Sequence, residues 1–230
     1  MQTSSYQQAA EAALSRRPVR TGTVMDEEPP ATAWGLHALE DPALAPPHAR
    51  PVWRSDRFGP VIRATAEPWR EDCAAQDLKP LARLATLVRG GETQHLLLSD
   101  GYRAVRLDAT AARLDAGPAR LRFDLAGFGD LRSQLPALRQ LAAVAVHGSF
   151  ATGLHPPASR ARRMVLMLRA RDALAAGATQ RSIAAELLSD TAAETRWRVR
   201  SPSLRSQVQR LVRSATSMAS GSFWALLADN

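Results

Sequence analysis

The sequence predicts an α+β protein in which a small antiparallel β-rich domain is followed by a helical, helix-turn-helix-like domain. Short extended segments separated by turn signals occupy residues 51–125. Three amphipathic segments with capping residues follow over residues 160–218. At 230 residues, the chain is long enough for one domain with a substantial core or for two small ones. We therefore expect two parts of different composition along the chain.

The expected domain boundaries follow changes in composition. Residues 1–32 mix polar residues, alanine and charges of both signs, which favours a flexible N-terminal tail. Residues 33–147 are expected to form the β-rich domain with a closing helix. Residues 148–158 contain two prolines and are expected to be a linker. The helical domain is then expected over residues 159–230.

Strands are expected where extended segments alternate with turns. The glycine pair at 90–91 and the Ser-Asp-Gly turn at 99–101 favour an antiparallel meander. The candidate strands cover residues 51–54, 60–65, 82–89, 94–98, 102–107 and 120–125. Residues 78–87 could instead be a short helix before the sheet. Leucines at helical spacing predict a helix over residues 128–146, although Pro136 could reset its start.

Three helices are expected in the C-terminal part. The first covers residues 160–177 and ends at Gly177, a residue that readily adopts the left-handed conformation of a helix C-terminus. Thr179 is placed to cap the second helix, whose buried side begins at Ile183. Ser201 can cap the third, and Pro202 then occupies the first helical position, where its missing N–H costs nothing. The layout describes a helix-turn-helix-like domain.

The third helix, residues 201–218, has two distinct faces. One side of the helix is an apolar stripe of Leu204, Val208, Leu211 and Val212. The opposite side is polar and consists of Ser203, Ser206, Arg210 and Arg213. Positive charge is concentrated in this part, because residues 151–230 contain 12 arginines and 5 acidic residues in a chain of net charge +8. One face can therefore pack while the other meets an anionic partner such as a nucleic acid.

Other interpretations of this basic helix stay open. An arginine-bearing outer face occurs in many three-helix bundles, where it is simply solvated. Lys79 is the only lysine, and the base composition of the genome explains this arginine bias better than recognition of DNA does. The connection between residues 188 and 201 is longer than the turn of a compact helix-turn-helix motif. In it, Trp197 is expected to anchor the loop, while Arg196, Arg198 and Arg200 contact phosphate.

Segments in both parts of the chain resemble a known family. ATQRSIAAELL, SLRSQVQRLVR and MASGSFWALL occur in order near the C-terminus, and AWGLHALEDPALAPPHARPVWRSD and GETQHLLLSDG occur upstream. These segments, over roughly residues 33–227, are similar to the RovC-type DNA-binding domain family of proteobacterial transcription factors, long catalogued as a domain of unknown function. The resemblance implies a sequence-specific transcriptional regulator that can assemble as an oligomer. Trp224 stands where the family usually has a basic residue.

The pattern and the resemblance together predict a DNA-binding transcriptional regulator whose third helix enters the major groove. The predicted DNA-contacting residues are Arg181, Arg198, Arg200, Ser201, Ser203, Arg205, Ser206, Gln209, Arg210 and Arg213, with Arg162, Arg169 and Arg196 as further backbone contacts. The expected partners are double-stranded DNA, further copies of the chain and RNA polymerase. The alternative is a non-catalytic assembly module whose arginine face binds acidic partners.

Motifs of enzymes, cofactor sites and membrane proteins are missing from the sequence. It contains no G-x-S-x-G elbow, no phosphate-binding loop and no dinucleotide fingerprint. The five histidines are scattered and Cys73 is the only cysteine, so we expect no metal site and no cofactor. His95 is expected to face the surface from a strand. No apolar stretch approaches the roughly 20 residues of a membrane helix, which favours a cytoplasmic, nucleoid-associated protein.

Overall fold

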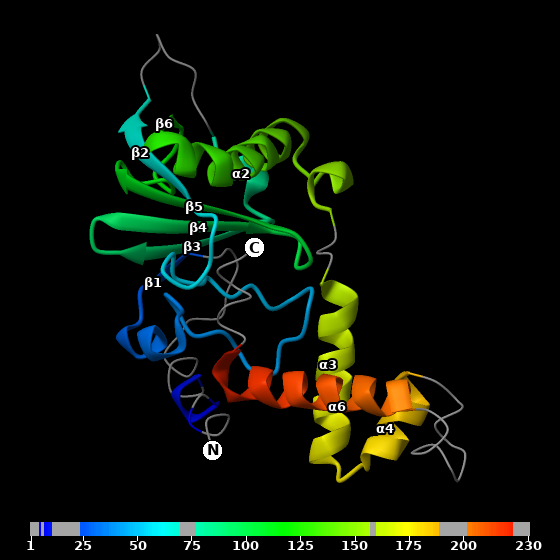
Figure 1. Ribbon diagram of the computed structural model, residues 1–230. Coiled ribbons are helices and arrows are strands. Elements are labelled where there is room, and N and C mark those ends of the chain that lie inside the picture. Colours follow the sequence, from blue (N-terminus) through cyan, green and yellow to red (C-terminus); the bar gives the residue numbers. More distant parts are fainter. Residues whose placement is uncertain are drawn as a thin grey trace. The chain divides into compact units, whose positions relative to one another are not determined.

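The computed structural model describes residues 5, 7–10, 24–69, 77–156, 160–188 and 202–222 (Figure 1). The chain divides into two compact units, which consist of residues 1–156 with 228–230 and of residues 157–227. The first contains a six-stranded sheet and the second contains helices α3, α4 and α6. The expected α+β fold class is confirmed. The division between the units lies inside the segment 148–158 that the sequence suggests as a linker.

A mixed sheet forms the centre of the first unit. Its strands are β1 (Val24–Asp26), β2 (Ile62–Pro68), β3 (Ala85–Gly90), β4 (Thr93–Ser99), β5 (Ala104–Ala111) and β6 (Ala119–Phe123). They are arranged in the order β1-β3-β4-β5-β2-β6. The expected antiparallel meander is present as β3-β4-β5. However, β1 pairs with β3 and β2 pairs with β5 in parallel, so the sheet is not antiparallel throughout.

Two expectations about the N-terminal part are wrong. Val24–Asp26 belongs to the sheet and is followed by a 3₁₀ helix, Pro29–Trp34, so residues 24–32 are not a flexible tail. Residues 51–54 form no strand, and there Trp53 makes an isolated bridge to Leu36. The three residues of β1 are too few for an alternating pattern, and their pairing depends on the neighbouring strand β3.

Both faces of the sheet are covered. One face packs against helix α2 (Gly127–His147), where Leu96 and Val144 lie in the main core. The opposite face packs against the irregular segment between the 3₁₀ helix and β2, and there Val88 of β3 meets Val52. Figure 1 shows α2 along one side of the sheet and this segment along the other. Strand residues that alternate in direction therefore contribute to two different buried layers.

Helix α2 is one continuous helix, and Pro136 lies in its interior rather than at its start. Ala137, Leu141 and Val144 are its buried apolar positions. Leu131 and Leu135, by contrast, are 37% and 45% exposed. The spacing of the leucines thus identifies the helix correctly but does not identify its buried face.

The face of the sheet opposite α2 also buries polar side chains. His95 on β4 is 7% exposed and Arg106 on β5 is 2% exposed. The expectation that His95 faces the surface is therefore wrong. A strand that is covered on both faces has no solvent-facing side, and a polar residue on it must find partners inside the protein.

Acid should weaken the first unit through Asp115, which lies between β5 and β6. A bidentate hydrogen bond from Arg113, with distances of 2.8 and 3.1 Å, and a single hydrogen bond from Arg89 hold the pKa of this carboxyl far below its ordinary value of 3.8. A lowered folded-state pKa contributes stability above the unfolded-state value, and this stability is lost as the pH falls through the folded-state pKa. The free energy of unfolding should therefore decrease as the pH falls below 3.8. This decrease should be smaller in Asp115→Asn than in the wild type.

This pH dependence is measured by urea denaturation between pH 2 and pH 6. Glu92→Gln is the matched control, because Glu92 is an exposed carboxylate in the neighbouring β3–β4 turn and forms no ion pair with any described residue. Equal acid sensitivity in Asp115→Asn and in the wild type would contradict the assignment.

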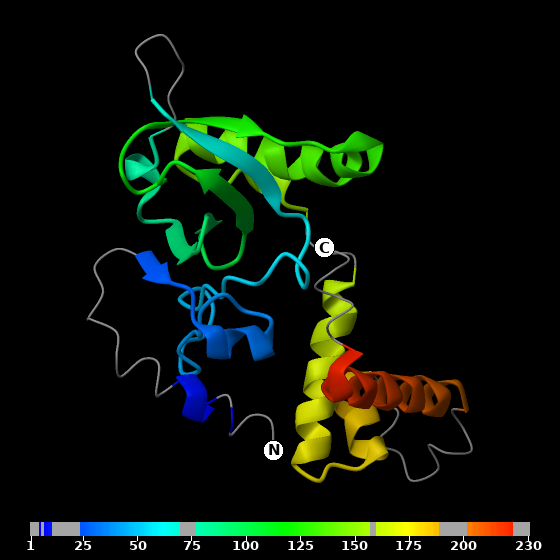
Figure 2. The ribbon, with the colours of Figure 1, turned by 90° about the vertical axis from the view of Figure 1, so that its left-hand side faces the viewer.

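The second unit consists of three packed helices. They are α3 (Ala161–Ala175), α4 (Gln180–Leu187) and α6 (Pro202–Ser217), and a short π-helical turn, Met218–Ser222, follows α6. Their shared core includes Ala170, Ile183, Ala184, Leu204, Val208, Leu211 and Ala215. Figures 1 and 2 show that α6 crosses α3, with α4 beside both. Six of these seven positions are among those that the helical periodicity predicts, whereas Ala215 is an addition and the predicted Val212 is only half-buried.

The end of α3 and the start of α4 have the expected caps. Gly177 adopts a left-handed φ of 81°, and its N–H donates to the carbonyl of Leu174 at 3.0 Å. The N–H of Ala178 donates to the carbonyl of Ala173 at 2.9 Å, which completes a Schellman motif. At the next helix, Thr179 Oγ1 accepts a hydrogen bond from the N–H of Ser182 at 3.2 Å. The short connection between α3 and α4 is thus fixed at both ends.

Removing the Thr179 cap should destabilise the helical unit. Thr179→Ala leaves an N–H in the first turn of α4 without its acceptor, at an expected cost of about 1 kcal/mol. Thermal unfolding followed by circular dichroism measures the change. Thr179→Ser keeps the hydroxyl and should lose little stability. If the alanine variant were as stable as the serine variant, the cap would have no energetic role.

Candidate nucleic-acid interface

Helix α6 presents the polar face that the sequence predicts. Leu204, Val208 and Leu211 are buried against α3 and α4. On the other side of the helix, the exposed residues include Ser203, Arg205, Ser206, Arg210 and Arg213, and Gln209 is half-buried. No acidic residue occurs between Pro202 and Ser217. The outer face of α6 is therefore basic and hydrogen-bonding throughout.

Four residues of this face share one side of the helix. Ser206, Gln209, Arg210 and Arg213 are spaced at i, i+3, i+4 and i+7, and residues at this spacing lie next to each other along a helix. The guanidinium groups of Arg205, Arg210 and Arg213 form no ion pair with any residue that the structure describes. Their charges are thus not neutralised by the part of the protein that surrounds them there.

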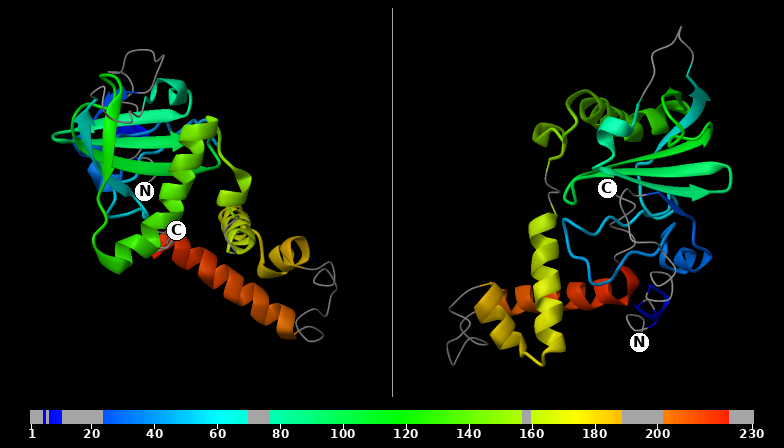
Figure 3. Two further views of the ribbon diagram at one scale, coloured as in Figure 1. Left: turned by 90° about the horizontal axis from the view of Figure 1, so that it is seen from above. Right: turned by 180° about the vertical axis from the view of Figure 1, so that it is seen from behind.

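An open hollow lies beside this face, between the N-terminal half of α3 and the C-terminal half of α6. Its volume is about 430 Å³. Arg160, Arg163 and Arg213 line it together with methionines 164, 167 and 218 and two serines of α6. The crossing of α3 and α6, visible in the right view of Figure 3, brings these three arginines together. Three positive groups around one concave surface favour binding of an anion.

Sequence reasoning missed Arg160 and Arg163 as members of this surface. The basic run at the start of α3, Arg-Ala-Arg-Arg over residues 160–163, is the signal that could have found them. Arg162 of the same run was included among the predicted backbone contacts, and it is exposed. The crossing of α3 and α6 determines which residues of this run lie near Arg213. A local sequence pattern does not predict that crossing.

The remaining predicted arginines fall into two groups. Arg169 on α3 is exposed but pairs with Glu186 of α4, with an Nη2–Oε1 distance of 3.2 Å. Such an exposed pair contributes little to stability, so Arg169 can exchange this partner for another anion. Arg181 is half-buried in the first turn of α4. Arg196, Arg198, Arg200 and Ser201 lie outside the described residues, as does Trp197.

The charge of the described helical unit is strongly one-sided. Residues 160–188 and 202–222 contain nine arginines, whereas their acidic residues are two, Asp172 and Glu186. This excess creates a positive potential over an otherwise ordinary helical surface and draws polyanions toward it. A basic three-helix unit with an acid-free outer helix is typical of a nucleic-acid-binding domain.

Comparison with known proteins agrees with this class. Residues 124–228 match the family model of the RovC DNA-binding domain, which is described as "T6SS, Transcription factor, DNA binding domain". The resemblance to this family is thus confirmed over that segment, and it supports a DNA-binding regulator rather than an enzyme. No match was found among curated proteins or among solved structures.

The matched segment is wider than the helical unit. It begins at Asp124 and therefore includes α2, which packs on the sheet of the first unit. It ends at residue 228, outside the described part of the chain. The upstream similarity over residues 33–123 lies outside the match and stays a prediction. In the described part of the chain, no helix has both the length and the apolar character to cross a membrane.

Proposed function

We propose that the protein is a sequence-specific transcriptional regulator that places the outer face of α6 in the major groove of DNA. The observation that carries this proposal is the exposed, acid-free basic face of α6 inside the segment that matches a transcription-factor DNA-binding domain. The major groove admits an α-helix and displays a distinct pattern of donors and acceptors for each base pair. α3 and α4 hold α6 from its apolar side, as in helix-turn-helix-like domains.

The proposed base-reading residues are Ser206, Gln209, Arg210 and Arg213. An arginine fork donates two hydrogen bonds to guanine, and the glutamine amide pairs with adenine in the same bidentate way. Ser206 can serve either as donor or as acceptor. Their common side of α6 supports this role, because a helix in the groove reaches base edges from one face only.

Phosphate contacts surround this face in the proposal. Arg160 and Arg163 join Arg213 at the hollow between α3 and α6, and Arg162 and Arg205 extend the positive surface. Ser203 lies in the first turn of α6, where free N–H groups and the helix dipole favour a phosphate. Arg181 and Arg169 on the other two helices add backbone contacts, and Arg196, Arg198, Arg200 and Ser201 keep the roles that the sequence suggests for them.

The first unit supplies the regulatory contacts in this proposal. Its covered sheet has no recognisable catalytic constellation among the described residues, and it precedes the segment that reads DNA. We assign to it oligomerisation and contact with RNA polymerase or an effector. An oligomer would read repeated half-sites. The protein then works at the nucleoid in the cytoplasm.

The test is fluorescence anisotropy with the chain's own promoter region and with random duplex DNA, across a salt series. Each phosphate contact steepens the dependence of log K on log salt by about 0.9, so four or more contacts give a slope of about −3.5 or steeper. We expect promoter DNA to bind more tightly than random DNA at every salt concentration. Absence of binding at low salt would contradict the proposal and favour the alternative, an assembly module whose arginine face binds acidic partners.

A further inference from the structure

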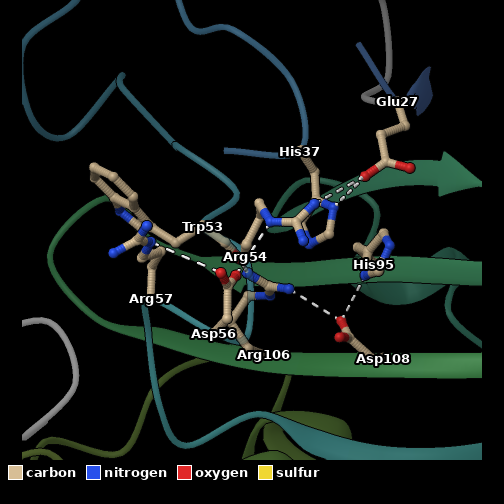
Figure 4. Close-up of polar contacts among 9 residues, drawn as sticks. All are labelled: Glu27, His37, Trp53, Arg54, Asp56, Arg57, His95, Arg106 and Asp108. Atoms are coloured by element: carbon tan, nitrogen blue, oxygen red, sulfur yellow. Dashed lines mark hydrogen bonds and ion pairs between the residues drawn. The ribbon is translucent and has the colours of Figure 1, made fainter. Parts of the chain in front are cut away.

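A polar cluster lies in the first unit, between the sheet and the segment that covers the face opposite α2. Glu27 follows β1, His37 follows the 3₁₀ helix and His95 lies on β4 (Figure 4). The rings of His37 and His95 stack with their centroids 3.5 Å apart. Both histidines are buried and Glu27 is half-buried. The fold thus brings together two imidazoles and a carboxylate from residues that are far apart in the sequence.

Carboxylates hydrogen-bond to both rings. His37 Nδ1 lies 2.9 Å from Glu27 Oε1, and His95 Nδ1 lies 2.9 Å from Asp108 Oδ1. Burial opposes ionisation of Asp108, but its hydrogen bond with His95 and the charge of Arg106 outweigh burial and lower its pKa. An ionised carboxylate only accepts hydrogen bonds, so the Nδ1 atom of His95 carries the proton. A histidine whose Nδ1 bonds a carboxylate in this way, as His95 bonds Asp108, is typical of metal ligands.

The second nitrogen of His37 has no partner. Its Nε2 atom is buried and makes no hydrogen bond with any described residue. Nδ1 faces Glu27 and Nε2 points away from it, so an ion that both residues share takes the place of the Nδ1–Oε1 hydrogen bond.

Gly90, at the end of β3, leaves space beside these groups. A Cβ atom at this position would lie 2.6 Å from Glu27 Oε2 and 3.3 Å from His95 Nε2. Any other residue would therefore push against the carboxylate and crowd the imidazole. The bare backbone keeps Glu27 and His95 facing the same small volume.

We propose that Glu27, His37 and His95 bind a divalent transition-metal ion, with Zn²⁺ as the physiological ion. One ligand atom from each residue lies within 4.8 Å of the others. Two imidazoles and one carboxylate form a ligand set that Zn²⁺ uses, with a fourth position left for water. The rings rotate out of their stacked arrangement as their nitrogens close on the ion. The site is independent of DNA binding, because it lies outside the segment that matches the DNA-binding family.

The test is metal content after equilibrium dialysis of tag-free, chelator-treated protein against micromolar ZnCl₂. We expect about one zinc per chain and a rise in the unfolding temperature of the wild type. His37→Gln and His95→Gln should lose this zinc, whereas His147→Gln, at the exposed end of α2, should keep it. Gly90→Ala keeps every ligand but fills their space, and it should weaken binding by about tenfold or more.

Circular dichroism separates loss of zinc from loss of folding. If the histidine variants do not fold, Glu27→Gln decides, because this half-exposed side chain keeps its shape and loses only its charge. A folded Glu27→Gln that binds zinc as tightly as the wild type would overturn the site. So would a wild type that takes up no stoichiometric zinc, or variants of His37 and His95 that bind it unchanged.

Discussion

Replacing Arg210 and Arg213 together by alanine is expected to weaken DNA binding by at least about 30-fold. A good base contact contributes about 1–3 kcal/mol, so the loss of two corresponds to about 2–6 kcal/mol. Both side chains are exposed on α6, and neither forms an ion pair with a described residue, so the helix should fold as before. Fluorescence anisotropy gives the change in Kd, and discrimination between promoter and random DNA should decrease as well.

The control must remove the same charge elsewhere. Arg120→Ala/Arg122→Ala does so on β6, outside the segment that matches the DNA-binding family. Both of these arginines lie near Glu67, with N–O distances of 4.0 and 3.3 Å, in exposed pairs that contribute little to stability. We expect this control to bind within about threefold of the wild type, since it changes only the long-range field. Equal losses in the two double variants would show that net charge, rather than α6, determines affinity.

Asp108→Ala is expected to cost about 3–5 kcal/mol of folding stability. Arg106 is almost completely buried, and its Nη2 lies 3.0 Å from Asp108 Oδ1 while Nη1 donates to the carbonyl of Trp53. Removing the carboxylate leaves a buried guanidinium charge without its counterion. His95 loses its hydrogen-bond acceptor in the same variant. Urea denaturation followed by tryptophan fluorescence measures the loss.

A second variant distinguishes the unpaired charge from the loss of packing. Arg106→Met/Asp108→Ala removes both charges, and it should be more stable than Asp108→Ala alone because no uncompensated charge stays buried. Glu67→Ala, which breaks an exposed pair on the same sheet, should cost less than about 1 kcal/mol. If Asp108→Ala were no more destabilising than Glu67→Ala, the buried pair would not hold the sheet and its covering segment together.

The helical unit could be predicted because its folding signals are local. The apolar stripe from Leu204 to Leu211 repeats within a few turns, and Gly177 and Thr179 act on residues only a few positions away. The exposed face of α6 follows from the same periodicity. Its approach to Arg160 and Arg163 does not, because this depends on the crossing of two helices that are separated in the sequence.

Strands β2 to β6 could be predicted, but their pairing could be predicted only in the hairpins. Turn signals at residues 90–91 and 99–101 identify β3, β4 and β5, whose partners follow directly along the chain. The parallel pairing of β1 with β3, and of β2 with β5, joins strands that are not adjacent in sequence. No local pattern encodes such a pairing.

The polar cluster escaped prediction for the same reason. His37 and His95 carry no metal-binding spacing, and each one alone is an ordinary residue in a loop or a strand. They meet because the segment that contains His37 covers the face of the sheet on which His95 lies. Burial of His95 likewise depends on that cover, which the alternation along β4 does not reveal.

Photocrosslinking to promoter DNA that carries 5-iodouracil tests the central claim most directly. The iodine replaces the thymine methyl group and therefore projects into the major groove. Trypsin cleaves after Arg205 and Arg210, so a crosslink to the centre of the outer face appears in mass spectra on the peptide that covers residues 206–210. We predict that this peptide carries the crosslinked base. Crosslinks confined to peptides outside α6 would contradict the assignment of this helix as the reader of DNA.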